Sequence, residues 1–149
     1  MAKGGIENLK AFKRKLDKRL EKNAVKRLEN FITVSTLDVR GTILESLQRG
    51  GTGTTYQKYN PRRQHTASSP GEPPVTDTGQ LASSISTTVK RRGTAIVGQI
   101  IAAAPYAADL EFGTKAMKKK GGGRPFMQPA LEKNRPKIRR LFKRGGYLD

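Results

Sequence analysis

The sequence predicts an α+β protein, and three observations lead to that class. Apolar residues recur at three- and four-residue steps from Ile6 to Leu47, the pattern of an amphipathic helix. Two β-branched runs, residues 85–90 and 94–101, flank a turn glycine and indicate an antiparallel hairpin. Near the C-terminus, Pro129 opens a further segment with apolar residues at helical spacing. A chain of 149 residues fits one ordinary domain with extensions.

The N-terminal helical region, residues 1–48, is expected to form two helices or one bent helix. One straight helix of this length would project far from so small a domain, and the β-branched stretch 32–36 is a weak point. Basic residues separate the apolar ones in the first half: Lys10, Lys13, Arg14, Lys15, Lys18, Arg19, Lys22, Lys26 and Arg27. They predict a basic outer surface, partly offset by acidic residues, and an ordinary solvated helix face explains the pattern equally well.

Residues 49–75 are expected to form a long flexible loop. Their composition shifts to Gly, Thr, Ser and Pro, with little apolar surface to bury. Loops of more than about 15 residues are uncommon in compact domains and are usually functional or disordered. We therefore expect this loop to become ordered against neighbouring subunits, with an insertion that has no role as the alternative.

Residues 76–149 are expected to form an α+β core with a basic C-terminal helix. Asp77 or Thr78 can cap a brief helix over residues 79–84, because either side-chain oxygen can accept from backbone amides one turn on. The predicted hairpin follows this helix, with Gly93 at its turn.

The remaining elements are a short helix, a loop and the last helix. Pro105 suits the first turn of the short helix and Gly113 its C-terminal cap. Residues 115–124 are basic and rich in glycine, which predicts a mobile, exposed loop or hairpin tip. The final helix begins at Pro129 and ends near residue 145, and Pro136 could kink it by removing a backbone donor.

The charge of the chain predicts a polyanionic neighbour. Thirty Lys and Arg face twelve Asp and Glu, a formal net charge of +18 that would repel itself in a compact monomer. The C-terminal third is especially basic, and such a field suits contacts with phosphate backbones. The candidate contacts with DNA or an acidic partner are Lys118, Lys119, Lys120, Arg124, Arg139 and Arg140. Few aromatic residues lie among them, which disfavours recognition of single strands by base stacking.

The residues needed for an enzyme are scarce, so we expect no catalytic, cofactor or metal site. The chain has no cysteine, and its only histidine, His65, lies in a polar segment where a solvated side chain is the better interpretation. Asp109 and Glu111 are two residues apart and point to different faces of a helix, so a salt bridge or a cap is favoured over an acid pair. No run of apolar residues is long enough to span a membrane.

Several short blocks of the sequence occur in an order and at a spacing that we recognise. They are Ser69-Pro70-Gly71-Glu72-Pro73-Pro74, Thr76-Asp77-Thr78-Gly79-Gln80-Leu81, Ala104-Pro105-Tyr106-Ala107, Leu110-Glu111-Phe112-Gly113-Thr114 and Arg124-Pro125-Phe126-Met127-Gln128-Pro129. Over residues 69–135 the chain resembles the neck, or tail-completion, proteins of long-tailed double-stranded DNA bacteriophages. The N-terminal helices and the basic tail match that family in character only, and the triple lysine is more basic than its pattern.

The resemblance implies a non-enzymatic virion protein of the head-tail connector, assembled in the host cytoplasm. It implies an oligomeric ring around the DNA channel, for which we expect six-fold symmetry, with twelve-fold second. Its partners would be head-closure proteins and tail-terminator or tail-tube proteins. The motif residues would maintain the fold or contact partners, and Tyr106 and Phe112 are expected to supply large buried faces.

Two other interpretations remain open at the level of sequence. A cellular basic nucleic-acid-binding protein, such as a ribosome-associated or nucleoid factor, would explain the charge alone. A small enzyme acting on nucleic acid would need clustered carboxylates or histidines, which the sequence does not visibly provide.

Overall fold

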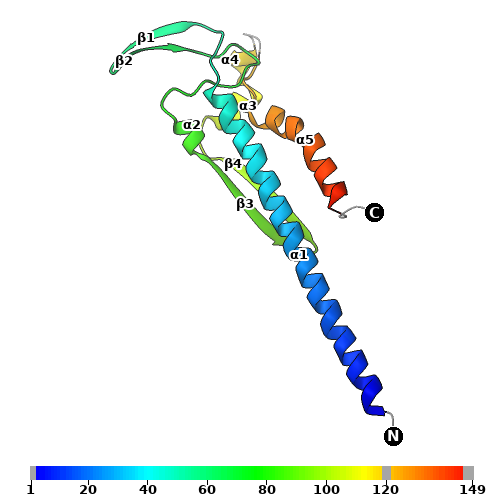
Figure 1. Cartoon of the computed structure of the whole chain (residues 1–149). Helices are drawn as coiled ribbons and strands as arrows, with labels where there is room; N and C mark the ends of the chain where they lie inside the picture. The colour runs from blue at the N-terminus through cyan, green and yellow to red at the C-terminus, as the bar shows by residue number, and fades with distance from the viewer. Residues whose placement is uncertain (1–2, 119–121, 146–149) are drawn as a thin grey trace.

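The computed structural model describes residues 3–118 and 122–145 and confirms the α+β class. Its helices are α1 (Lys3–Gln48), α2 (Gln80–Ser83), α3 (Ala107–Phe112), α4 (Lys115–Lys118) and α5 (Met127–Arg144). Its strands are β1 (Thr55–Tyr59), β2 (Arg62–Thr66), β3 (Ile85–Arg92) and β4 (Ala95–Ala102), in two separate antiparallel hairpins. The long helix α1 is the axis on which the other elements are arranged (Figure 1).

The expected break in the N-terminal helix is wrong, because α1 is one continuous helix of 46 residues. At 1.5 Å per residue it is about 70 Å long. Within its β-branched stretch, the hydroxyls of Thr33 and Thr36 donate to the carbonyls of Glu29 and Ile32, at 2.8 and 2.7 Å, so both hydroxyls find acceptors inside the helix. The stretch also packs on other elements, and Thr36 is buried. The N-terminal half of α1 instead extends beyond every other element (Figure 1).

The β3–β4 hairpin packs along the C-terminal half of α1. Both strands form where the sequence predicts them, each within two residues of its expected ends, and Ile85 pairs with Ala102 at the open end. At Gly98 the strand lies so close to the helix that an added Cβ would stand 2.1 Å from Oγ1 of Thr36. Arg40 of α1 donates from Nε to the carbonyl of Ile85 at 3.0 Å, which joins helix and strand.

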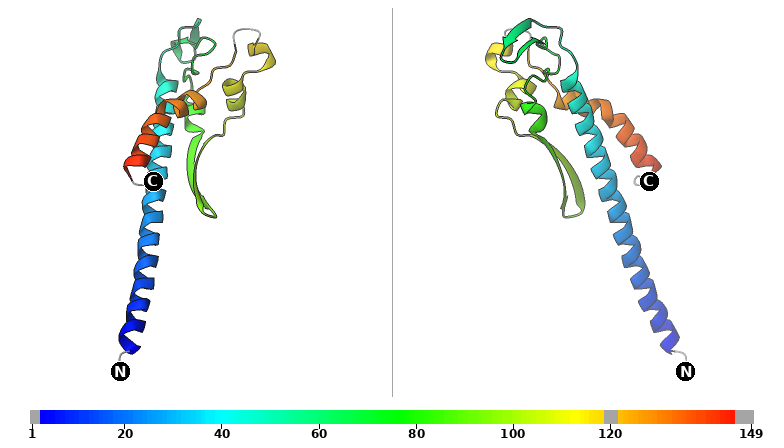
Figure 2. Two further views of the ribbon diagram at one scale, coloured as in Figure 1. Left: turned by 90° about the vertical axis from the view of Figure 1, so that its right-hand side faces the viewer. Right: turned by 60° about the vertical axis from the view of Figure 1, so that its left-hand side comes forward.

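Helix α5 packs on a different side of α1 from the hairpin (Figure 2). The rings of Phe31 and Phe142 have centroids 5.5 Å apart, and Nδ2 of Asn134 donates to Oγ1 of Thr42 at 2.9 Å. The apolar core lies where α1, the hairpin and the start of α5 meet. It consists of Val39, Ile43, Leu47, Leu81, Ile85, Ala104, Ala107, Phe126 and Ala130.

The segment predicted as a long loop contains a regular hairpin, β1–β2, with Thr55 opposite Thr66. The sequence does not signal it, because both strands are polar and lack alternating apolar residues. Glu72 joins the two ends of this segment, before β1 and after β2. Its carboxylate accepts from Oγ1 of Thr52 at 2.6 Å and from the amide of Ser69 at 2.9 Å. The hydrogen bond from Thr52 is the largest cause of a lowered pKa for Glu72.

The basic glycine-rich segment begins as a helix rather than as a loop. Residues 115–118 form α4, and Oγ1 of Thr114 accepts from the amide of Met117 at 3.2 Å at its start. Lys118 is exposed at the end of α4. Lys119 and Lys120 lie outside the described residues, so their predicted role as contacts stays a prediction.

Candidate assembly and DNA-contact surfaces

Glu111 joins α3 to the start of α5. Its Oε2 accepts from the amides of Phe126 and Met127 at 2.8 and 3.0 Å, and its Oε1 accepts from the amide of Gln128 at 2.9 Å. These are amides that a helix start leaves without an internal acceptor, and a carboxylate is favoured there by the helix dipole. The expectation of a cap for Glu111 is confirmed, with the cap placed on another helix.

Arg124 joins the same region to the 49–75 segment. Its Nε and Nη2 donate to the carbonyl of Ser68 at 3.1 and 3.0 Å, and its amide donates to the carbonyl of Leu110 at 2.7 Å. Gly113 adopts φ 74°, caps α3 and contacts Gly123. The C-terminal cap expected at Gly113 is confirmed. The sequence predicts Arg124 on a mobile tip as a DNA contact, but its guanidinium is engaged within the fold.

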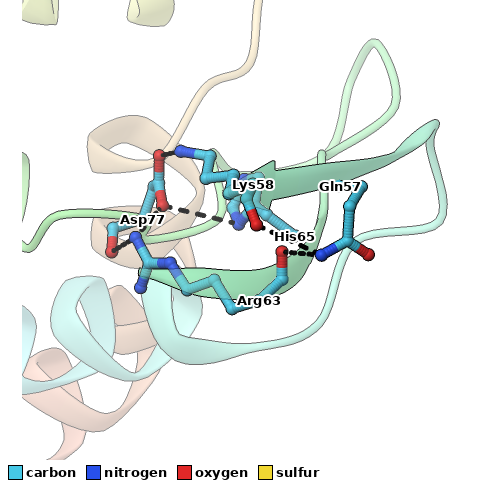
Figure 3. Close-up of polar contacts among 5 residues, drawn as sticks. All are labelled: Gln57, Lys58, Arg63, His65 and Asp77. Atoms are coloured by element: carbon cyan, nitrogen blue, oxygen red, sulfur yellow. Dashed lines mark hydrogen bonds and ion pairs between the residues drawn. The ribbon is translucent and has the colours of Figure 1, made fainter. Parts of the chain in front are cut away.

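Asp77 does not cap α2, which corrects the expectation for it and Thr78. The N-cap of α2 is Gly79, with φ 78° and no side-chain cap bond. Asp77 instead accepts from Lys58 and Arg63, and so holds the β1–β2 hairpin against the chain that leads into α2 (Figure 3). These two ion pairs depend on β1 and β2, which the local sequence does not predict. For this reason the sequence wrongly assigned Asp77 as the cap of α2.

His65 is also placed by this cluster, and its prediction as a solvated side chain is wrong. Its side chain is 19 % exposed, and Nδ1 lies 4.0 Å from Oδ1 of Asp77 (Figure 3). The hydrogen bond from Lys58 is the largest cause of a lowered pKa for Asp77, and the charges of Lys58, Arg63 and His65 act in the same direction. Asp77 therefore stays ionised as the anchor of the hairpin.

We expect the β1–β2 hairpin to loosen from its anchor in acid. A carboxyl whose pKa is lowered by folding stabilises the folded state above its unfolded pKa, and this contribution is lost as the pH falls through the lowered value. For Asp77 the loss begins near the ordinary value of 3.8 and is completed below it. Protection factors of the amides in β1 and β2, which correct for the intrinsic pH dependence of exchange, should fall over this range and should already be low at neutral pH in Asp77→Asn. The control, Asp109→Asn, should keep the protection factors of the natural sequence. Equal protection factors in the natural sequence, Asp77→Asn and Asp109→Asn at neutral pH would contradict the role of Asp77 as the anchor of the hairpin.

The motif residues divide into buried and exposed groups. Leu81 and Phe126 are core residues, with Phe126 only 1 % exposed. Tyr106 and Phe112 are 38 % and 74 % exposed, so the expectation that they supply buried faces is wrong. Pro105 precedes α3 instead of lying in its first turn, whereas Pro129 lies inside the first turn of α5 and Pro125 just before that helix. Two exposed aromatic side chains therefore lie at the end of the fold where α3 meets the start of α5.

A groove of about 520 Å³ opens beside Phe112, and sequence reasoning missed it. We call it the α3–α5 groove. Its lining is largely apolar and comes from α1, β4, α3 and α5. The residues that matter for its shape are Val39, Ile43, Ile100, Ala108, Phe112 and Leu131. Only the tertiary structure brings these four elements together, so no local pattern could have predicted the groove.

A second apolar surface lies on the projecting half of α1. Leu9, Phe12, Leu16 and Leu20 are 69 %, 62 %, 45 % and 58 % exposed. Their three- and four-residue steps place them on one side of the helix, and we call them the α1 stripe. The sequence predicts the amphipathic pattern, but the structure provides no partner for it among the described residues.

The basic candidates on α5 form a third surface. Arg139 and Arg140 are exposed and border a shallow hollow with other side chains of the helix. That hollow is lined by Arg135, Pro136, Arg139, Arg140, Lys143 and Arg144. Pro136 lies within α5.

No known protein family, curated protein or solved structure matches the chain. Over the described part of the chain there is no helix both long and apolar enough to cross a membrane. Within residues 3–118 and 122–145, no group of His, Asp and Glu side chains could hold a metal ion.

Proposed function

We propose that the chain is a structural subunit of the neck of a long-tailed bacteriophage, forming a ring at the head-tail junction around the DNA channel. In this role it joins or completes the tail, contacts head-closure and tail-terminator or tail-tube proteins, and catalyses no reaction. The motif blocks over residues 69–135 suggest this role. The observation that carries it is the α1 stripe, because it supplies surface for assembly that the isolated chain leaves in water.

The stripe favours an assembly protein by its energetic cost. Fully burying a Leu or Phe side chain contributes about 1.5–3 kcal/mol. Four such side chains, each at least 45 % exposed on a helix that extends away from the core, leave a large part of that free energy unused in the monomer. Charge alone suggests the alternative, a cellular nucleic-acid-binding protein, but charge does not account for the exposed α1 stripe.

The ring can be tested with the purified chain alone. Multi-angle light scattering should give one mass that is a multiple of the monomer's 16.4 kDa, six-fold in our expectation, and negative-stain images should show a central channel. A mass that stays at one subunit at high concentration, with or without head-closure and tail-terminator proteins, would contradict the proposal. A monomer that binds DNA tightly would favour the nucleic-acid-binding alternative.

We also expect the basic surfaces to contact DNA by charge alone. Replacing Arg139 and Arg140 by Ser should lower the salt slope of DNA binding by about 0.9 for each phosphate that the protein no longer neutralises. The triple change of Lys118, Lys119 and Lys120 to Ser tests the tip in the same way. Exposed charges contribute little to stability, so melting temperatures should hardly change.

The matched control for the α5 variant is Arg91→Ser with Arg92→Ser at the β3–β4 turn. It removes the same charge from another exposed place. Fluorescence titrations against a short duplex at several salt concentrations provide the slopes. If the slope falls equally in the α5 and turn variants, the contribution is from net charge and α5 is no specific contact surface.

A further inference from the structure

We propose that the α1 stripe of one subunit docks in the α3–α5 groove of the next, so that each copy donates its helix in one direction around the assembly. The inference rests on the proposed ring and states which surfaces close it. It assigns an occupant, a second copy of this chain, to two surfaces that are open in the monomer.

The stripe cannot reach the groove of its own chain. Both lie on α1, which is one continuous helix, with Leu16 in the stripe and Val39 in the groove. The 23 residues between them correspond to about 35 Å along the helix axis. A stripe that finds this groove must therefore come from another molecule.

The groove has the chemistry that leucine side chains need. Its floor contains Val39 and Ile43, which are 3 % and 0 % exposed, and its rim contains Phe112 and Leu131, which are 74 % and 48 % exposed. The exposed rim is apolar surface that a docked helix would cover. An amphipathic helix placed in an apolar groove through residues at three- and four-residue steps is a recurrent mode of protein recognition.

Charge favours docking in this groove over pairing of the helices with one another. Between residues 9 and 27, nine Lys and Arg face only Asp17 and Glu21, a net charge of +7. A bundle of several such helices would gather these charges around one axis at a high cost. The groove instead has two exposed carboxylates beside it: Asp109 follows the lining residue Ala108 on α3, and Glu132 on α5 accepts from Nε2 of the lining residue Gln128 at 2.9 Å. Neither carboxylate forms an ion pair within the described residues, and the basic side chains towards the C-terminal end of α5 line a separate hollow.

The charges beside the α1 stripe are opposite to those of the carboxylates beside the α3–α5 groove. Lys13 is three or four residues from both Leu9 and Leu16, so it lies beside the stripe on the same face of the helix. A stripe placed between Phe112 and Leu131 brings such lysines towards the acidic residues of α3 and α5. Because donor and acceptor surfaces differ, the contact is head-to-tail, which generates a ring when the rotation closes.

Crosslinking tests this direction, because the chain contains no cysteine of its own. The variant Lys13→Cys with Ala108→Cys places one thiol beside the stripe and one in the groove, and it keeps the four stripe side chains and the rim residues Phe112 and Leu131. With a short bismaleimide, denaturing gels should show a ladder of covalent oligomers that ends at the number of subunits in the ring. The matched control, Lys13→Cys with Arg62→Cys at the tip of the β1–β2 hairpin, should give no ladder.

Four results would overturn this head-to-tail docking. Dimers from Lys13→Cys alone would show that the helices pair with one another. A paired-cysteine variant that stops at dimers would show a two-fold exchange instead of a ring. An oligomer in light scattering without any 13–108 crosslink would leave the proposed ring standing and place the stripe elsewhere, whereas a strict monomer would overturn both proposals.

Discussion

Replacing Leu16 and Leu20 by Asp should abolish self-association and leave the subunit folded. These side chains are 45 % and 58 % exposed in the single chain, so its core does not depend on them. Fully burying a Leu side chain contributes about 1.5–3 kcal/mol, and about half of each side chain remains to be buried on assembly. The two substitutions together therefore remove about 1.5–3 kcal/mol of interface free energy, which weakens each contact by roughly one to two orders of magnitude, and the buried Asp carboxylates add a desolvation cost. Light scattering over a range of concentrations measures the weakening, and thermal melting checks the fold.

The control must add the same charge to other faces of the same helix. Ala11→Asp with Lys22→Asn changes the net charge by −2, as the leucine pair does, and leaves the α1 stripe intact. This control should assemble like the natural sequence. Equal loss of assembly in both variants would mean that charge on α1, and not the stripe, governs association.

Replacing Glu111 by Ala should destabilise the fold more than replacing any exposed charged residue. Its carboxylate accepts from three backbone amides at the start of α5, and the alanine variant leaves them without that acceptor. Loss of a charged cap of this kind costs about 2 kcal/mol. For a chain of 149 residues that corresponds to a fall of roughly 4–8 °C in melting temperature.

The neighbouring carboxylate supplies the control for the cap. Asp109 lies on the same short helix but is exposed, so Asp109→Ala should change the free energy of unfolding by less than about 0.5 kcal/mol. Since Glu111 also lines the α3–α5 groove, its removal should weaken assembly as well as stability. Similar denaturant midpoints for Glu111→Ala and Asp109→Ala would contradict the role of Glu111 as the link between α3 and α5.

The two halves of the chain differ in how well local sequence predicts them. The β3–β4 hairpin and α5 carry strong local signals, namely β-branched runs around Gly93 and helical spacing after Pro129, and both form within two residues of their expected starts. The β1–β2 hairpin carries no apolar alternation, so local sequence predicts a loop there. It is held by ion pairs from Lys58 and Arg63 to Asp77, which are distant in sequence.

The α+β class, the basic surface and the amphipathic character of α1 could all be predicted from residue types and their spacing. That α1 is unbroken depends on tertiary packing, because the stretch 32–36 lies against β4 at Gly98 and this burial outweighs a weak local preference. Only the tertiary structure decided that Glu111 caps a distant helix, that Phe112 is exposed, and that four elements enclose a groove. Such contacts depend on where the chain returns to itself, and that is set by burial of the whole core and not by any local pattern.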